Sequence, residues 1–231
     1  MNGRKMNPHL ILVIGVLGIS CSAIFVKTAQ APSVITATYR LLWTVVLLTP
    51  SALFFHRKEW GDVQKKDVIW CCLSGIFLAF HFSSWFASLK YTSVASSMAI
   101  MSTEVIFTAL GFALFLKGKI GKKAWGCIAL AVVGSIVIAL TDQASATNAI
   151  YGDFLALLGA IFISGYTLIG RQQRGHLSNT IYTYMVYSAC AVTLLLMDAV
   201  TATPVFGWGW KELLIGLCLA LFCTLLGHSL F

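Results

Sequence analysis

The chain contains very little charge for its size. Only 10% of its 231 residues are Asp, Glu, Lys or Arg, while 58% are hydrophobic and the mean hydropathy is +0.86. A soluble domain of this length cannot bury so much apolar surface, whereas a bilayer with a hydrocarbon core about 30 Å thick accepts it. The composition therefore excludes a soluble globular protein and indicates an integral membrane protein.

The sequence also lacks the motifs of several enzyme and metal-binding classes. There is no nucleotide-binding motif and no H-E-x-x-H zinc motif, and the stretch 161–165 lacks the first glycine of the G-x-S-G that a rhomboid-like protease needs. The seven cysteines lie in apolar runs without metal-site spacing, so we interpret them as packing residues. We expect no metal, no cofactor and no enzymatic activity.

What the chain does have is a series of apolar runs separated by short polar loops. Lipid offers the backbone no hydrogen-bond partners, so each run is predicted to be a helix. The expected helices cover 9–28, 33–55, 68–89, 94–116, 124–141, 151–170 and 180–200, with an eighth starting near Lys211 and still apolar at Phe231. The predicted fold class is an all-α, polytopic membrane helix bundle. Because no closing polar segment follows the eighth run, we interpret the chain as C-terminally truncated.

The basic residues predict the orientation of this bundle. If the N-terminus is cytoplasmic, the inner segments hold 12 of the 16 basic residues, namely Arg4, Lys5, Arg57, Lys58, Lys65, Lys66, Lys117, Lys119, Lys122, Lys123, Arg171 and Arg174. We therefore predict a multi-pass protein of the cell membrane with a cytoplasmic N-terminus. Placement of the basic residues in loops argues against a nucleic-acid partner and for membrane lipid.

Three ionisable residues fall at membrane depth, where a charge costs at least about 2.5–3.5 kcal/mol. From the helix rise, Arg40, His81 and Glu104 lie roughly 10, 12 and 15 Å below the outer surface. Each lies on a polar stripe of its helix, so we expect the three to share a hydrated cavity. Four aromatic residues are further candidates for lining it: Trp43, Trp85, Tyr166 and Tyr187.

Each of these residues also has a purely structural interpretation. Glu104 can pair with Arg40 as a buried bridge, Arg40 can extend to the outer surface, and His81 can be a hydrogen-bonded core histidine. The tyrosines can be packing residues. The sequence leaves these alternatives open.

Several motifs, taken together and in order, resemble those of the EamA-type branch of the drug/metabolite transporter superfamily. Residues 86–97 resemble the stretch A-L-x-Y-T-S-A-A-x-A, residues 126–140 resemble G-x-x-L-x-x-x-G-V-x-L, and residues 226–231 resemble L-G-Y-x-L-W. Two positions depart from the family pattern. Val105 stands where a proline often follows the glutamate, and Gly118 replaces a usual acid.

The resemblance implies ten helices arranged as two inverted five-helix repeats around a central cavity. On that plan residues 1–143 form the first repeat and residues 150–231 an incomplete second one. It further implies a secondary transporter of small organic metabolites that works by alternating access, with a proton as a possible coupling ion. Glu104 is then the candidate proton or amine site, and Arg40 complements a carboxylate or tunes Glu104. The alternatives are a non-transporting receptor or assembly subunit and, less favoured, an intramembrane enzyme. Substrate, direction of transport and oligomeric state stay open.

Overall fold

A computed structural model describes residues 17–18, 20–141, 148–173, 175 and 177–228, and in these ranges every regular element is a helix. The all-α prediction is therefore confirmed. The α-helices are α2 (Ser22–Thr28), α3 (Ser33–Pro50), α4 (Lys65–Tyr91), α5 (Val94–Met101), α6 (Glu104–Phe115), α7 (Lys122–Thr141), α8 (Ala149–Gln173), α9 (Asn179–Val200) and α10 (Trp210–Cys218). Two π-helical segments continue α3 and α10, η1 (Ser51–Phe55) and η3 (Leu219–His228), and a short 3₁₀ helix, η2, covers Arg57–Asp62.

Five helical stretches of the described chain are long and apolar enough to cross a membrane. They are Ser33–Phe55, Lys65–Tyr91, Val94–Phe115, Ala149–Gln173 and Asn179–Val200. Each coincides with a predicted span to within three residues at either end. The first part of the predicted helix 9–28 lies outside the described residues, and its last part is α2. The chain is thus a polytopic helical membrane protein.

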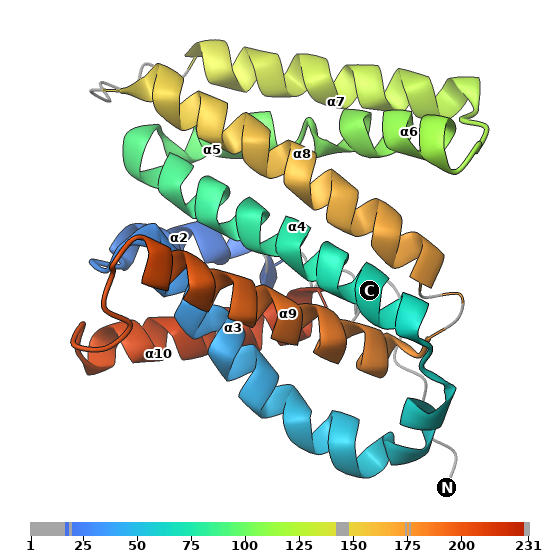
Figure 1. Ribbon diagram of the computed structural model, residues 1–231. Coiled ribbons are helices and arrows are strands. Elements are labelled where there is room, and N and C mark those ends of the chain that lie inside the picture. The colour runs from blue at the N-terminus through green and yellow to red at the C-terminus, as the bar shows by residue number, and fades with distance from the viewer. Residues whose placement is uncertain (1–16, 19, 142–147, 174, 176, 229–231) are drawn as a thin grey trace, which may run out of the picture.

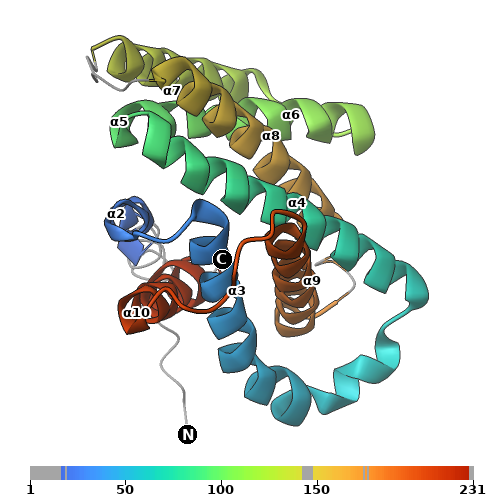
Figure 2. The ribbon, with the colours of Figure 1, turned by 60° about the vertical axis from the view of Figure 1, so that its left-hand side comes forward.

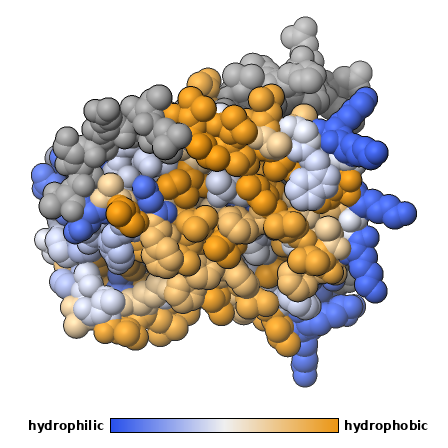
Figure 3. Space-filling model, turned by 90° about the horizontal axis from the view of Figure 1, so that it is seen from above, coloured by the Kyte–Doolittle hydropathy of each residue, from blue (hydrophilic) through white to orange (hydrophobic). Residues whose placement is uncertain are grey.

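The outer surface of the bundle is apolar. Large side chains such as Phe55 and Phe115 are more than 80% exposed, as expected where lipid replaces water. On the face shown in Figure 3, hydrophobic side chains form a broad band, and the most hydrophilic ones gather along one edge. The connection between α6 and α7 carries two exposed lysines, the start of α7 carries two more, and this connection lies at that end of the bundle (Figure 1).

The long helix α4 lies between two groups of helices (Figures 1 and 2). On one side it packs against α8, which in turn contacts α5 and α6, while α7 packs on α5. On the other side α4 packs against α9 and α3, and α10 packs on α3. The polar residues of α4 can therefore face either of two separate environments.

Glycines let these helices approach closely. A Cβ atom placed on Gly75 of α4 would lie 2.6 Å from Ala189 Cβ and 2.7 Å from the Val186 carbonyl oxygen of α9. A Cβ atom on Gly152 of α8 would lie 2.7 Å from the Thr92 backbone nitrogen. Such small-residue contacts are the usual way in which membrane helices pack without a hydrophobic driving force between them.

Polar contacts tie the elements together at the end of the bundle where α4 ends. Lys90 Nζ donates to the Ala31 carbonyl at 2.6 Å. The Asp153 carboxylate accepts hydrogen bonds from the hydroxyls of Thr92 and Ser96 at 2.8 and 2.9 Å. These bonds join α4 and α5 to α8 and to the loop before α3, at the end that the sequence predicts to face outward.

Candidate functional site

The sequence predicted one continuous helix over 94–116. The structure instead has two helical segments in the span Val94–Phe115, joined by a tight turn at Ser102 and Thr103. The Thr103 amide donates to the Ile100 carbonyl at 3.0 Å, and the Ile106 amide to the Thr103 carbonyl at 2.9 Å. These three-residue steps are typical of 3₁₀ geometry, which often marks a functional hinge. The hydroxyls of Ser102 and Thr103 also donate to backbone carbonyls of the preceding turn, which competes with the regular helix ladder. Glu104 is the first residue of the second segment, α6.

A cavity of about 260 Å³ opens beside this turn, and we call it the Glu104 cavity. Residues from α4, from the two segments of the broken helix and from α8 line it: His81, Trp85, Met98, Met101, Ser102, Glu104 and Ile163. Glu104 lies ten residues into the span, so the cavity is near the middle of the membrane.

The hydrogen bond that ties Glu104 to α8 is made by its backbone carbonyl and not by its carboxylate. Its carbonyl accepts a hydrogen bond from Ser164 Oγ of α8 at 2.9 Å. Within the described part of the chain, no hydrogen bond or ion pair reaches its carboxylate. A group that is costly to bury is thus positioned by its backbone and has no partner for its carboxylate among the residues that the structure describes.

His81 presents a hydrogen-bond acceptor on the α4 side of the cavity. Its Nδ1 lies 3.0 Å from the Gly159 carbonyl oxygen of α8. A carbonyl can only accept, so the neutral imidazole carries its proton on Nδ1, and Nε2 is an acceptor. The ring stacks on Trp85 with centroids 5.7 Å apart and an angle of 16° between the planes. The histidine is therefore fixed in orientation by a hydrogen bond and a ring contact.

Trp85 contributes a donor that lacks a partner. Its side chain is 6% exposed, and no acceptor among the described residues lies within hydrogen-bond distance of Nε1. Leaving a buried donor unsatisfied costs about 1–3 kcal/mol. The Trp85 ring thus lines the cavity, while its Nε1 is buried and has no partner among the described residues.

The structure separates Arg40 from His81 and Glu104, contrary to the expectation of one shared cavity. Arg40 is 1% exposed, and its Nε donates to Thr224 Oγ1 at 2.8 Å. Its Nη1 lies 3.3 Å from Ser22 Oγ, and its Cζ lies 4.3 Å from the centroid of the Phe82 ring. No ion pair joins Arg40 to an acid in the described residues, and the side chain does not reach the surface.

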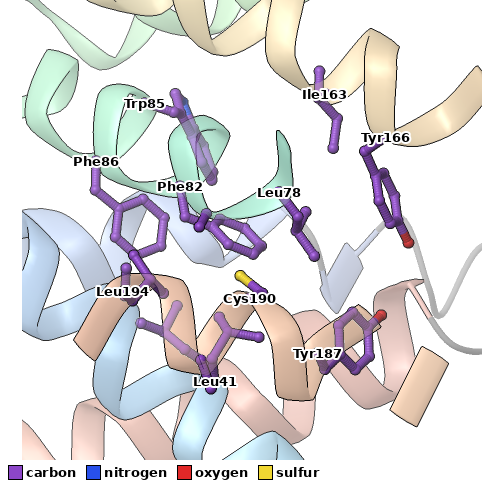
Figure 4. Close-up of a cluster of buried hydrophobic side chains, with 14 of the residues drawn as sticks. Leu41, Leu78, Phe82, Trp85, Phe86, Ile163, Tyr166, Tyr187, Cys190 and Leu194 are labelled. Carbon is purple, nitrogen blue, oxygen red and sulfur yellow. The ribbon is translucent and has the colours of Figure 1, made fainter. Parts of the chain in front are cut away.

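The reason for this separation is the helical turn of α4. One residue along a helix rotates the side chain by about 100°, so Phe82 and Phe86 face a different direction from His81 and Trp85. Figure 4 shows Phe82 and Phe86 extending toward Leu41 and Leu194, with Trp85 on the other side of the helix. Arg40 therefore lies over the rings of Phe82 and Phe86, whereas the cavity lies beside His81 and Trp85.

The remaining candidates are not among the residues that line the cavity. Trp43 Nε1 donates to the Leu213 carbonyl at 3.1 Å and thereby links α3 to α10. Tyr166 and Tyr187 belong to the buried hydrophobic cluster drawn in Figure 4, together with Leu78 and other residues. Packing, the alternative that the sequence left open for the tyrosines, matches their position.

Sequence reasoning missed other residues at the cavity and at the helix ends. Met98, Met101 and Ile163 are apolar and gave no signal, whereas the adjacent hydroxyls at 102 and 103 could have indicated a break. Two buried acids were also overlooked because they lie near predicted helix ends. Asp198 accepts from Thr38 Oγ1 at 2.7 Å, and Glu212 accepts from the Gln30 amide at 3.0 Å.

A polytopic helix bundle with a polar cavity at a broken helix near the membrane midplane has the architecture of a membrane transport protein. Residues 6–140, more than half of the chain, match the EamA-like transporter family. The chain belongs to this family, part of the drug/metabolite transporter superfamily, as its motifs predicted.

Several known proteins are similar to the chain. An uncharacterized transporter of Archaeoglobus fulgidus is 25% identical over 209 residues, which cover 85% of this chain and 69% of the relative. The uncharacterized transporter YyaM of Bacillus subtilis is 26% identical over 177 residues, covering 74% and 57%. A probable 4-amino-4-deoxy-L-arabinose-phosphoundecaprenol flippase subunit, ArnE, of Hamiltonella defensa is 28% identical over 104 residues, covering 43% and 94%. The chain therefore spans little more than half the length of YyaM.

Proposed function

We propose that this protein is a secondary transporter that moves small organic metabolites across the cytoplasmic membrane by alternating access. In this proposal the substrate binds in the Glu104 cavity, and the N-terminus lies in the cytoplasm. The observation that carries the proposal is the Glu104 carboxylate, which lines a cavity at membrane depth without a hydrogen-bond or ion-pair partner in the described residues. The family and the transporter names of two relatives support it.

The physical argument concerns the cost of an acid at this depth. An ionised carboxylate in the membrane costs at least about 2.5–3.5 kcal/mol unless a proton, a cation or water offsets that cost. A substrate cation and a proton both satisfy the carboxylate, and they compete for it. Competition of this kind couples the movement of one to the opposite movement of the other.

The broken helix provides a structural basis for alternating access. Both α5 and α6 contact α8, and Ser164 of α8 is bonded to the Glu104 carbonyl. A displacement of α8 therefore acts directly on the acid. Discontinuous helices beside midplane sites are common in secondary transporters.

Proteoliposomes loaded with a pH-sensitive dye test this function. When a panel of small amines and neutral metabolites is added, the internal pH is expected to change in vesicles that contain the wild-type chain. Glu104→Gln is expected to reduce this change at least tenfold. Asp62→Asn is the matched control, because Asp62 is an exposed acid in η2. Wild-type flux and pH dependence in Glu104→Gln would refute the assigned role.

A second candidate function is that of a subunit in a larger membrane assembly. The similarity to a protein named as a flippase subunit, of which the chain covers 94%, favours it. A subunit of this kind gives no flux when reconstituted alone, although it is folded. The same vesicles therefore separate the two functions, provided that thermal unfolding shows a cooperative transition for the chain.

A further inference from the structure

The polar groups that the Glu104 cavity offers to a ligand are hydrogen-bond acceptors. The Glu104 carboxylate accepts from any direction, and His81 Nε2 is an acceptor because the Gly159 carbonyl holds the proton on Nδ1. No lysine or arginine is among the lining residues. A molecule that binds here has to supply donors and positive charge.

The buried cation Arg40 is not among the residues that line the cavity. Arg40 lies on the other side of α4, where Thr224, Ser22 and the Phe82 ring contact it. A carboxylate or phosphate ligand would therefore meet Glu104 without a compensating positive charge. Like charges at close range are strongly unfavourable in a medium of low dielectric constant. The cavity accordingly excludes anions.

The rest of the lining favours a compact apolar body. Met98, Met101 and Ile163 supply adaptable hydrophobic surface, and Trp85 adds an aromatic ring. A volume of about 260 Å³ is below the range of roughly 300–1,000 Å³ typical of pockets for drug-sized ligands.

We propose that the Glu104 cavity selects compact amines with at least two N–H donors, that is, primary or secondary ammonium ions, over quaternary ammonium ions and over anions. One N–H donates to the Glu104 carboxylate, and another donates to His81 Nε2. A quaternary ammonium carries the charge but has no N–H, so it leaves the histidine acceptor unpaired. This inference rests on the proposed function for the location of the site, but it concerns binding alone.

A methylation series on one ring scaffold tests the inference. The purified full chain in lipid nanodiscs is titrated by calorimetry with benzylamine, N-methylbenzylamine, N,N-dimethylbenzylamine and benzyltrimethylammonium. Affinity is expected to fall along the series, with about a tenfold or larger gap between the first and last members, because a charge-assisted hydrogen bond is lost. Benzoate is expected not to bind. Equal or tighter binding of benzyltrimethylammonium would overturn the proposal, and so would the absence of binding by every amine.

Variants assign the selectivity to residues. His81→Phe keeps a ring against Trp85 but removes the acceptor, so the gap is expected to shrink to about threefold or less. Glu104→Gln is expected to weaken all four cations together and to leave their order unchanged. Trp43→Phe is the control, because the Trp43 Nε1 hydrogen is already donated to the Leu213 carbonyl. An unchanged gap in folded His81→Phe would contradict the assignment, and if that variant does not fold, the wild-type series still decides.

The transport function and the amine selectivity can be disproved independently of each other. A chain that ranks the amines as stated but moves none of them in vesicles disproves the transport function and leaves the selectivity intact. A chain that transports the four cations with equal apparent affinity supports transport and disproves the selectivity.

Discussion

The two sides of α4 treat a charged group in opposite ways. On the side of α3 and α9, Arg40 is enclosed, with hydroxyls at two of its nitrogens and aromatic rings over its plane. On the side of α5 and α8, Glu104 lies against a cavity with its carboxylate unpaired among the described residues. The comparison shows that membrane depth alone does not identify a functional charge. What distinguishes the two is whether the protein already satisfies the group.

The same contrast appears in the packing. The contact of α4 with α9 is so close that backbone atoms meet at Gly75, whereas the contact of α4 with α8 leaves room for a cavity near Gly159. Both sides contain empty space, because a second cavity of about 410 Å³ lies between α4 and α9, but among the described residues only the cavity on the α8 side is lined by an acid. Three sets of substitutions, at Arg40, at the glycines and at Ser164, break or sharpen this comparison.

Arg40→Ala is expected to have the largest effect on stability, about 3–5 kcal/mol. It empties a buried volume and leaves the hydroxyls of Ser22 and Thr224 without their donor. Arg40→Met is the matched variant, since it retains much of the volume and leaves no acid unpaired, and it should cost far less. Thermal unfolding in detergent measures both. A folded Arg40→Met protein that no longer binds benzylamine would place Arg40 in the site after all.

Gly75→Ala and Gly159→Ala apply one added methyl group to the two sides of α4. At Gly75 the new Cβ lies 2.7–2.8 Å from backbone atoms of α9 that cannot move separately, so we expect a loss of about 1–3 kcal/mol. At Gly159 the nearest atoms are Met101 Sδ at 3.2 Å and Trp85 Cβ at 3.3 Å, and a loss below about 1 kcal/mol is expected.

Gly134→Ala on α7 gives the baseline, because nothing lies within 4 Å of its added carbon. It is expected to be neutral or to stabilise the helix by about 0.5–1 kcal/mol. Denaturant midpoints for the three alanine variants provide the ranking. If Gly75→Ala is as stable as Gly159→Ala, the two sides of α4 do not differ in tightness.

Ser164→Ala is expected to cost about 0.5–1.5 kcal/mol in stability, less than Arg40→Ala. Its hydroxyl donates to the Ala160 and Glu104 carbonyls, so the variant loosens the backbone that presents the acid and lowers benzylamine affinity a few fold. Thr193→Ala is the control, because that hydroxyl donates within its own helix to Ala189. Equal amine affinity in Ser164→Ala and the wild type would show that the bond does not position Glu104.

The fold was largely predictable because lipid removes most alternatives for the backbone. The span 33–55 was predicted with the bounds that the structure has, and the interruption at 102–103 was missed because hydropathy does not register a change from four-residue to three-residue hydrogen-bond steps. The repeat organisation and the orientation stay predictions.

The candidate site was predictable only in part. His81 and Glu104, which the sequence places at similar depth, line one cavity. Depth along a helix does not, however, indicate on which side of α4 the Arg40 side chain lies. That direction depends on which helices pack where, which is a property of the whole bundle. Trp43 illustrates the same limit, since a carbonyl of α10 takes its hydrogen bond.

The turn at Ser102 and Thr103 means that α5 and α6 do not have to move as a single rod. Both α5 and α6 pack on α8, and Glu104 lies directly after the turn that connects them. A tilt of one half relative to the other changes the position of Glu104, the first residue of α6. In the transport cycle that we propose, such a tilt turns this one side chain toward the two aqueous compartments in succession.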